Sequence, residues 1–409
     1  MVMKRVGVIG GGQLAWMMAG AAEKLGIELL VQTPSCDDPA VSIAAKTILA
    51  TIDDATATAE LAALCDVITF ENEFVNLEAL LELAKQGVCF RPGLDALKPL
   101  LDKYHQRCYL RELGLPTPRF ATWEELGWQV GVGRSKGDTQ ETLPITLSVC
   151  EASAEHSAMP EALHPAPSFP IVLKTRRHGY DGQGTFIIKD AQALDETLSR
   201  LGHAPLLVEE FVPFERELAA IAARSSNGDI VVYPIVETQQ EHQVCRRVFA
   251  PAAVSAAIAA DVEAIAQTLL SSLDVVGLFG IELFLTADGK VLVNEIAPRT
   301  HNSGHFTLDA CETSQFEQQL RAVTGLPLGS PAMTASGAVM VNLLGYEDSH
   351  SDYQEKRQRL TAIPNAHLHW YGKMESRLGR KLGHVTVLLE KGGSEMQLAS
   401  AIEAIWYSD

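Results

Sequence analysis

Two glutamates that flank a tight turn are the residues of this sequence most suited to chemistry. Asp288-Gly289 is a strong two-residue hairpin signal, with β-branched and aromatic residues on both sides of it. If these two residues form the whole loop, Glu282 and Glu295 lie directly opposite each other on one face, with Cβ atoms about 5 Å apart. The spacing therefore predicts a pair of facing carboxylates on a β-hairpin.

Two like charges at this distance repel each other by about 3 kcal/mol at an effective dielectric constant of roughly 20. A shared proton, a basic neighbour or a bound cation would relieve the repulsion. Ligands that are all oxygen favour Mg²⁺, held together with nucleotide phosphates. Two exposed glutamates are the alternative, which the apolar residues Phe284, Val291 and Val293 disfavour. Glu282 and Glu295 are therefore a candidate metal site.

A polar loop follows the second glutamate. Arg299, His301, Asn302 and His305 lie within a seven-residue segment that also contains glycine. A planar guanidinium matches a carboxylate-like anion, although a single arginine or histidine is usually structural. We expect an anion pocket that faces the predicted metal site, with Arg299 and Asn302 as its best candidates.

A lysine and a glycine-rich loop in the middle of the sequence suit nucleotide binding. Lys174 ends a predicted strand, and the loop 179–184 follows it. Such a pair can hold and cover nucleotide phosphates. The next apolar strand, 206–210, can present backbone groups to an adenine edge, and Glu217 could accept from ribose hydroxyls. Without the lysine and the glycine-rich loop, the acidic residues Glu209, Glu210 and Glu217 would be interpreted as a solvent-exposed face.

A second glycine-rich loop opens the chain. Gly10, Gly12 and Ala15 fit the pattern G-x-G-x-x-A between a predicted strand and a predicted helix, where backbone N–H groups can bind an anion. A dinucleotide site also needs an acidic residue at the end of the second strand, and the strand 27–32 has none. Three interpretations of this loop remain possible: a site for another phosphate or polar ligand, a site for NAD, or a tight turn without a ligand.

Hydrophobic periodicity and turn residues place these segments on predicted elements. Strands are expected at 5–9, 27–32, 66–70, 88–91, 143–150, 171–174, 185–188, 206–210, 218–223, 230–235, 339–344, 367–371 and 384–389. Helices are expected at 13–25, 55–64, 77–86, 262–273 and 395–406, and a hairpin at 280–296. Strands that alternate with helices in the first third indicate a parallel sheet covered by helices.

The length of 409 residues is too great for one core, so we expect several domains. The predicted boundaries are 1–115 for a Rossmann-like parallel-sheet domain, 116–328 for a second domain and 329–409 for a small β-rich domain. The segment 127–169 is rich in Gly, Ser, Thr and Pro and is expected to be an irregular excursion.

Composition excludes several classes of protein. The hydrophobic fraction of 47% and the charged fraction of 21% are ordinary for a globular protein. A net charge of −18 disfavours nucleic acid and anionic membrane as partners. Seven scattered cysteines indicate a reducing cytoplasm, and the glycines at 10–12 argue against a signal peptide.

The motifs taken together resemble the ATP-grasp superfamily and, within it, the N5-carboxyaminoimidazole ribonucleotide synthetases. The resemblance covers nearly the whole chain. Its most specific part is the combination of NEIAPRTHNSGH (294–305) with HLHWYGK (367–373). The motifs are GGGQLAWM (10–17), TFENE (69–73), KTRRHGYDGQGT (174–185), VEEFVPFERE (208–217), GRKLGH (379–384), NEIAPRTHNSGH (294–305) and HLHWYGK (367–373).

This resemblance implies an ATP-grasp fold of α/β and α+β class and a ligase reaction. ATP, bicarbonate and aminoimidazole ribonucleotide would give the N5-carboxylated product, ADP and phosphate through carboxyphosphate. It implies a homodimer and leaves open a handover of product to a separate mutase.

The resemblance also implies roles for individual residues. ATP would be bound by Lys103, Lys174, Gly179, Tyr180, Asp181, Gly182, Gln183, Gly184, Thr185, Glu209, Glu210, Phe211, Val212, Glu217, Gln240, Asn294 and Glu295. Mg²⁺ would be bound by Glu282 and Glu295, and the bicarbonate pocket lined by Arg299, His301 and Asn302. The ribonucleotide would meet Tyr180, Asp181, Gln13, Glu73, Lys373, Arg380 and Lys381.

The sequence departs from the family pattern at several positions. Lys103 and Arg107 stand where the family usually has arginine and then lysine, so either could contact ATP. Gln240 stands where the family has a histidine, with His242 close by, and Gln183 replaces a basic residue. The alternatives to the synthetase are another carboxylate–amine ligase or a formate-dependent transformylase, an NAD-dependent oxidoreductase, and a non-catalytic ATP sensor.

Overall fold

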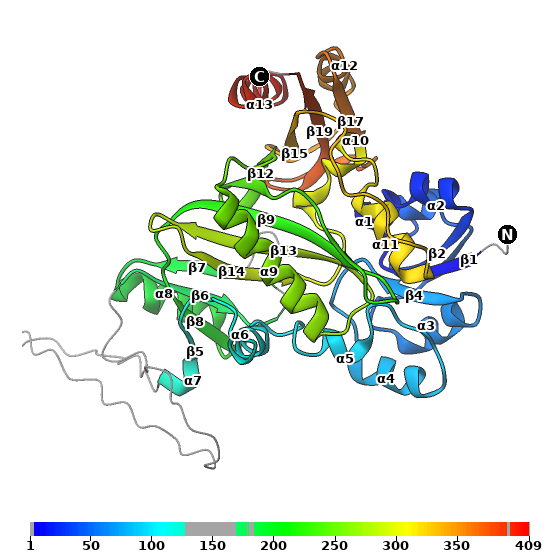
Figure 1. Ribbon diagram of the computed structural model, residues 1–409, viewed down its shortest axis with the longest axis horizontal. Coiled ribbons are helices and arrows are strands. Elements are labelled where there is room, and N and C mark those ends of the chain that lie inside the picture. The colour runs from blue at the N-terminus through cyan, green and yellow to red at the C-terminus, as the bar shows by residue number, and fades with distance from the viewer. Residues whose placement is uncertain (1–3, 127–168, 178, 180–183, 391–392, 409) are drawn as a thin grey trace, which may run out of the picture. The chain divides into compact units, whose positions relative to one another are not determined.

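The computed structural model describes residues 4–126, 169–177, 179, 184–390 and 393–408 (Figure 1). They form two compact units, one within residues 1–101 and 214–409 and the other within Asp102–Pro213. The predicted strand at 143–150 lies outside the described residues, as does the predicted excursion at 127–169 except for Phe169. The three predicted domain ranges stay a prediction.

A four-stranded sheet in the order β3-β2-β1-β4 forms the N-terminal part of the first unit. Its strands are β1 (Lys4–Ile9), β2 (Ile27–Thr33), β3 (Lys46–Leu49) and β4 (Val67–Phe70). Each strand pair is parallel, which confirms the predicted parallel sheet. The carboxyl ends of β1 and β4 lie at the same edge, so the residues that follow these strands are brought together.

Short helices connect these strands. They are α1 (Gln13–Trp16), α2 (Ala19–Leu25), the 3₁₀ helix η1 (Pro39–Ser42), α3 (Ala55–Ala62), α4 (Leu77–Lys85) and α5 (Leu94–Leu97). Asp54 and Asn76 cap α3 and α4, because their side chains accept hydrogen bonds from N–H groups of the first turn.

Two sequence expectations for this part need correction. The predicted helix 13–25 is two helices, because Met18 N bonds to Ala15 O only three residues back and the α-helical pattern stops there. The predicted strand 88–91 is reduced to a single parallel bridge between Ile68 and Phe90. It ends before Pro92, which has no backbone N–H to continue the pairing.

A nine-stranded sheet forms the rest of the first unit, in the order β14-β13-β9-β11-β12-β15-β19-β17 with β10 beside β9. Its strands are β9 (Phe214–Arg224), β10 (Ile230–Val232), β11 (Val236–Glu241), β12 (Val244–Ala250), β13 (Gly277–Thr286), β14 (Val291–Ala297), β15 (Gly337–Leu344), β17 (Ala366–Trp370) and β19 (Lys381–Leu389). Because β12 pairs with β15 in antiparallel fashion, one sheet continues from the predicted second domain into the predicted third.

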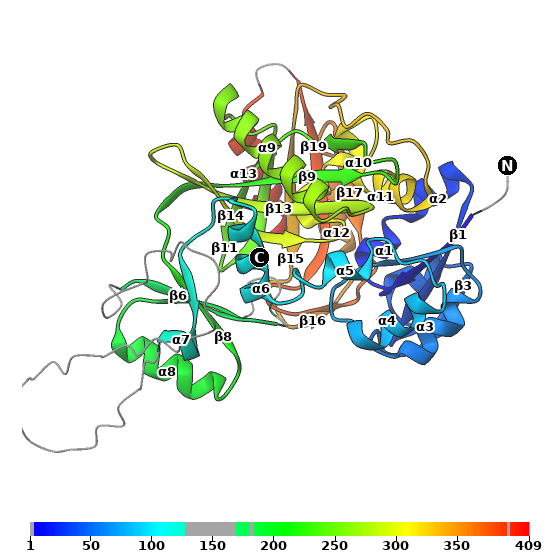
Figure 2. The same cartoon turned by 60° about the horizontal axis from the view of Figure 1, so that its bottom comes forward.

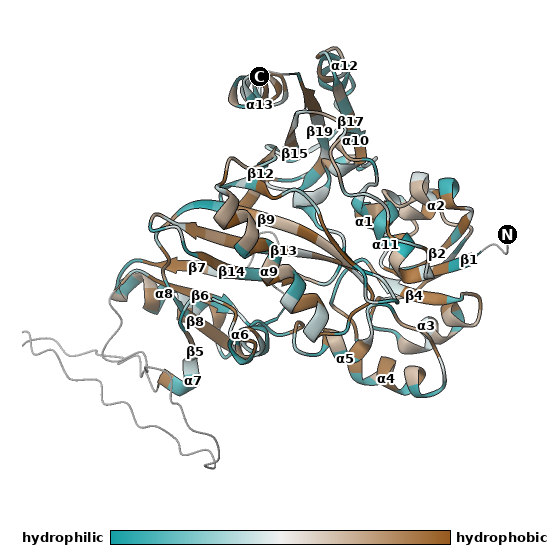
Figure 3. Ribbon diagram, in the orientation of Figure 1, coloured by the Kyte–Doolittle hydropathy of each residue, from teal (hydrophilic) through white to brown (hydrophobic). Residues whose placement is uncertain are grey.

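Apolar side chains pack against this sheet. The helix α9 (Ala256–Ser272) packs on β9 and β14 with Val262, Ile265 and Leu269 buried at helical spacing (Figures 1 and 2). Figure 3 shows the hydrophobic colour along β13 and β19. The remaining elements of the unit are η2 (Asn302–Gly304), α10 (Thr307–Ala310), α11 (Gln315–Thr324), β16 (Ser349–His350), α12 (Gln354–Thr361), β18 (Glu375–Ser376) and α13 (Glu395–Trp406).

The second unit is an antiparallel sheet in the order β5-β8-β6-β7 with helices beside it. Its elements are α6 (Lys103–Glu112), β5 (Phe120–Thr122), α7 (Trp123–Leu126), β6 (Ile171–Thr175), β7 (Thr185–Ile188), α8 (Ala191–Leu201) and β8 (Leu206–Glu210). Leu173, Ile188 and Val208 form its core. Asp102 caps α6 and also binds Arg176 at 2.9 Å, which ties the helix to the end of β6.

Candidate active site

The β13–β14 hairpin places the two predicted metal ligands opposite each other. Glu282 pairs with Glu295, as predicted, but the predicted two-residue loop is wrong. Thr286 N bonds to Lys290 O, so the loop has one residue more than predicted. A bulge further along β14 restores the pairing, because Leu283 lies opposite Val293. The extra residue at the bulge is Asn294.

The bulge directs the Asn294 side chain toward the carboxylate of Glu282. Asn294 Nδ2 donates to Glu282 Oε2 at 3.4 Å, and His301 Nε2 lies 3.3 Å from Glu282 Oε1. The ring is held from its other side, since His301 Nδ1 contacts Ser303 Oγ at 2.8 Å. Carboxylates and an amide oxygen on one half-buried sheet face fit the oxygen ligands that Mg²⁺ prefers. In the part of the chain described, no group of three or more His, Cys, Asp or Glu is placed to hold a metal.

Arg299 is held in a side-on ion pair with Glu73. Its Nε lies 2.7 Å from Glu73 Oε2, and its Nη2 lies 3.4 Å from Glu73 Oε1. The carboxylate therefore fixes the plane of the guanidinium, whose fork matches planar anions. The structure brings together two predicted site residues that are 226 positions apart in the sequence.

The Asn302 side chain forms two hydrogen bonds with another asparagine. Asn302 Nδ2 donates to Asn342 Oδ1 at 3.0 Å, and Asn342 Nδ2 donates to Asn302 Oδ1 at 2.7 Å. Asn342 also donates to Cys245 O, and both asparagines are buried. These bonds anchor the loop that carries Arg299 and His301 to β15 of the large sheet.

Two predicted ribonucleotide residues also meet. Lys373 Nζ donates to Gln13 Oε1 at 2.7 Å and to Lys381 O at 3.2 Å, although Gln13 and Lys373 are 360 positions apart. The Lys381 side chain is buried, whereas Arg380 donates to Glu375 O near the surface. The structure thus brings the Lys373 ammonium to α1 and to the backbone of Lys381.

The N-terminal glycine loop binds one of the chain's own carboxylates. Glu71, directly after β4, accepts hydrogen bonds from Gly12 N at 2.5 Å and Leu14 N at 3.0 Å. A Cβ on Gly12 would lie 2.5 Å from Glu71 Oε1, so only glycine permits this approach. Burial raises the pKa of Glu71, and the backbone N–H groups oppose that rise. Because the N–H groups of Gly12 and Leu14 already donate to the Glu71 carboxylate, the structure favours a loop closed by this side chain over a phosphate or NAD site.

The second unit buries a charged triad around Glu209. Glu209 Oε1 lies 2.5 Å from Arg107 Nε, and Glu209 Oε2 lies 2.9 Å from Lys174 Nζ. All three side chains are at most 7% exposed. Burial disfavours the carboxylate charge, but Arg107 and Lys174 outweigh that effect and lower the pKa of Glu209 to about 2.

This pKa predicts a loss of stability in acid. A carboxyl whose pKa is lower in the folded state stabilises the fold above its unfolded pKa and loses that contribution as pH falls through the folded pKa. The window for Glu209 therefore runs from pH 4.5 down to about 2. The protection factors of the β8 amides, which are corrected for the fall of the intrinsic exchange rate with pH, are expected to decrease as pH falls across this window in the wild type. A Glu209→Gln variant that shows the same pH dependence there would contradict the assignment.

The other predicted ATP residues are placed as follows. Lys103 begins α6 and its N–H bonds to Arg176 O, Thr185 lies opposite Lys174, and Glu210 pairs with Arg119 at the surface. Gly184, the last residue of the predicted loop, has a positive φ, Gly179 and Phe211 are half-buried, and Val212 is buried. In the first unit, Glu217 on β9 lies opposite Thr238, and Gln240 on β11 lies opposite Cys245. Tyr180, Asp181, Gly182 and Gln183 lie outside the described residues.

Three histidines lie close together; sequence reasoning placed His305 in the anion loop and assigned no role to His369 or His384. His384 lies between two others, with ring centroids 5.1 Å from His305 and 4.6 Å from His369. Tyr371 Oη bonds to His384 Nδ1 at 2.8 Å. Burial lowers the pKa of both His305 and His384 well below the ordinary histidine value, so both are neutral at pH 7. The motifs HLHWYGK and GRKLGH, already noted for their lysines, were the available signal.

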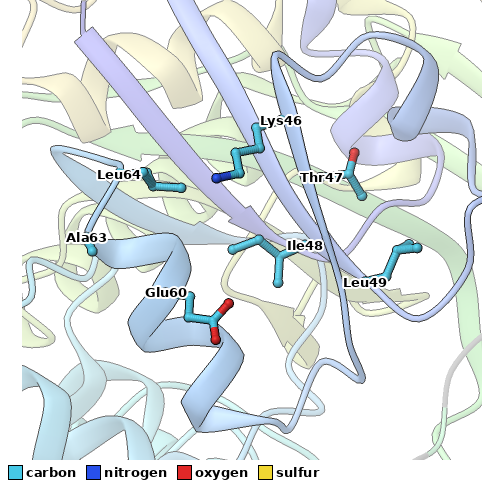
Figure 4. A pocket seen from close by; sticks show the side chains of 7 residues that line it. All are labelled: Lys46, Thr47, Ile48, Leu49, Glu60, Ala63 and Leu64. Atoms are coloured by element: carbon cyan, nitrogen blue, oxygen red, sulfur yellow. The ribbon is translucent and has the colours of Figure 1, made fainter.

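A pocket at the free edge of the N-terminal sheet contains none of the predicted site residues (Figure 4). It is lined by Lys46, Thr47, Ile48, Leu49, Glu60, Ala63 and Leu64. Among the described residues no helix has the length and apolar character needed to cross a membrane.

Models of known families match three successive parts of the chain. They are the ribonucleotide synthetase preATP-grasp domain at 3–99, the ATP-grasp domain at 141–316 and the phosphoribosylaminoimidazole carboxylase C-terminal domain at 338–395. The N5-carboxyaminoimidazole ribonucleotide synthase of Synechococcus elongatus is 52% identical over 99% of this chain and 96% of its own length. The chain belongs to the N5-carboxyaminoimidazole ribonucleotide synthase family.

Two further similarities extend this result. The crystal structure of the Aspergillus clavatus N5-carboxyaminoimidazole synthase with ADP and 5-aminoimidazole ribonucleotide has a TM-score of 0.80 and 29% identity, over 98% of this chain and 97% of that one. The chloroplastic phosphoribosylaminoimidazole carboxylase of Vigna aconitifolia is 37% identical over 94% of this chain but only 64% of its own length. The predicted fold class, an ATP-grasp fold with an N-terminal parallel sheet and a β-rich C-terminal part, is confirmed for this member of the synthase family.

Proposed function

We propose that this protein is an ATP-dependent carbon–nitrogen ligase that carboxylates 5-aminoimidazole ribonucleotide to N5-carboxyaminoimidazole ribonucleotide in purine biosynthesis. ATP and bicarbonate are consumed, and ADP and phosphate are released through carboxyphosphate. The observation that carries the proposal is the meeting of the carboxylate hairpin with the anion loop, at the contact between His301 and Glu282. The identity with the cyanobacterial synthase along 99% of the chain supports it.

The chain's own residues divide the work between charge neutralisation and positioning. Mg²⁺, held by Glu282 and Glu295, would supply charge neutralisation for the phosphates of ATP. Lys174, which is ion-paired with Glu209, would add a positive charge near the end of β6. Arg299, with its plane fixed by Glu73, would supply a positive charge to bicarbonate. Phosphoryl transfer depends mainly on such positioning and electrostatics.

The test is ADP release by the full chain with Mg·ATP, bicarbonate and aminoimidazole ribonucleotide. ADP formation is expected to require both bicarbonate and the ribonucleotide. Formate in place of bicarbonate distinguishes the transformylase alternative, because a transformylase would be active with formate. ADP release no higher than the rate without the ribonucleotide would refute the proposal.

Lys373 is proposed to bind the phosphate of the ribonucleotide. Replacing it with alanine removes a charged donor, so the KM for the ribonucleotide is expected to rise about tenfold to a hundredfold, the range for a hydrogen bond to a charged group. The KM for ATP is expected to stay within about twofold, and steady-state kinetics with each substrate varied in turn measures both. Lys85→Ala, on the exposed end of α4, is the control. Equal increases in both KM values would remove Lys373 from the ribonucleotide site.

The cellular context is also a proposal. We place the enzyme in the cytoplasm as a homodimer whose product passes to a separate mutase. Free cysteines among the described residues are consistent with a reducing compartment. The longer plant carboxylase has about a third of its length outside the match, which leaves room for a second activity. Sedimentation at micromolar concentration tests the dimer, and a monomer there would refute it.

A further inference from the structure

One glutamine side chain holds the backbone of His301 from both sides. Gln315, the first residue of α11, accepts a hydrogen bond from His301 N through Oε1 at 2.9 Å. Its Nε2 donates to His301 O at 2.8 Å. The amide therefore satisfies both polar backbone groups of the residue whose ring contacts Glu282.

The same amide is fully enclosed by the loop it supports. Gln315 is 0% exposed, and its Nε2 also lies 2.9 Å from His305 Nδ1. A Cβ on Gly304 would lie 2.6 Å from Gln315 Oε1, so the loop packs directly against the amide. The backbone is fixed as well, because Gln315 N donates to Thr307 Oγ1 at 2.9 Å. The amide has no room to turn without breaking several of these bonds.

The direction of the His301 ring follows from this arrangement. With its backbone held by Gln315, the ring bonds to Ser303 through Nδ1 and reaches Glu282 through Nε2. We propose that Gln315 is a positioning residue that orients His301 toward the predicted metal and bicarbonate site. The proposal rests on the proposed function for its kinetic consequence, but the orientation of the ring can be observed without turnover.

The molecule contains a matched control on the same helix. Gln318 is also 0% exposed, and its amide also bridges the N–H and C=O of one residue, Gly329, at 2.8 Å each. Neither Gln318 nor Gly329 belongs to the site. Gln315→Met and Gln318→Met therefore remove equivalent buried bonds with similar side-chain volume, and differ in whether the bonds support His301.

The kinetic test compares these two variants. Gln315→Met is expected to lower kcat/KM for bicarbonate about tenfold to a hundredfold, as for a slightly misplaced catalytic group, with the KM for ATP unchanged. Gln318→Met is expected to keep wild-type kinetics while losing similar thermal stability. Equal kinetics in the two variants would overturn the proposal. If Gln315→Met does not fold, Gln315→Glu retains the acceptor for His301 N and is expected to show the same selective loss; normal bicarbonate kinetics there would also overturn it.

A spectroscopic readout separates this inference from the proposed function. Histidine ring ¹⁵N–¹H spectra, with the His301 signal identified by its loss in His301→Gln, report the ring's hydrogen bonds without substrate. Gln315→Met is expected to shift the His301 signal, and Gln318→Met to leave it in place. An unshifted signal in Gln315→Met would overturn the positioning role even in an active enzyme. A shifted signal in a protein without ribonucleotide-dependent ADP release would support that role while refuting the proposed function.

Discussion

Glu295→Gln is expected to reduce kcat by about 10²–10³-fold or more, because it would remove one of the two carboxylates proposed to hold Mg²⁺ against the phosphates. The amide is nearly the same size as the carboxylate, and Glu295 lies opposite Glu282 on a hairpin held by apolar pairs such as Leu283 with Val293. The fold should therefore survive. Steady-state ADP release at increasing Mg²⁺ measures the effect, and the Mg²⁺ concentration needed for half-maximal rate is expected to rise.

The control for this variant lies on the same hairpin. Asp288 is in the loop, with its side chain 58% exposed and paired with Lys290. Asp288→Asn removes one negative charge near the surface and is expected to keep wild-type kcat. Near-normal turnover in Glu295→Gln would remove Glu295 from the metal site.

Glu209→Gln is expected to lower the free energy of unfolding of the second unit by about 3–5 kcal/mol, the cost of breaking a buried ion pair. The substitution leaves Arg107 and Lys174 buried without the carboxylate that both of them contact. Native-state hydrogen exchange at the amides of β6 and β8 measures this local stability without requiring the whole chain to unfold in one step.

The neighbouring residue provides the comparison. Glu210 pairs with Arg119, whose side chain is 63% exposed, so Glu210→Gln is expected to cost less than about 1 kcal/mol. Equal losses of unfolding free energy in Glu209→Gln and Glu210→Gln would mean that burial does not strengthen the ion pairs of Glu209 with Arg107 and Lys174.

The carboxylate pair shows how a sequence rule can succeed for an incomplete reason. The prediction assumed a two-residue loop, and the loop has one residue more, which alone would have separated Glu282 from Glu295. The bulge at Asn294 restores the pairing. Turn residues carry a sequence signal, whereas this bulge lacks a glycine or any other local mark.

Contacts between residues far apart in the sequence could not be predicted from local sequence patterns. Arg299 and Glu73 were each assigned to the site by resemblance, but no spacing rule predicts that they form a side-on pair. Glu71 was overlooked although a signal existed, because β1 and β4 are neighbouring parallel strands and the residues after them must lie together. Gln315 had no signal at all, since its role depends on tertiary packing against His301.

The pairing of β12 with β15 has a practical consequence for truncated versions of this enzyme. A fragment that stops at residue 328 would leave the edge of β12 without its partner, from Arg247 to Ala250. Exposed strand edges recruit other chains, so such a fragment should be prone to aggregation on expression. Truncated forms therefore need to retain β15, which begins at Gly337, or to carry charged residues on the exposed edge.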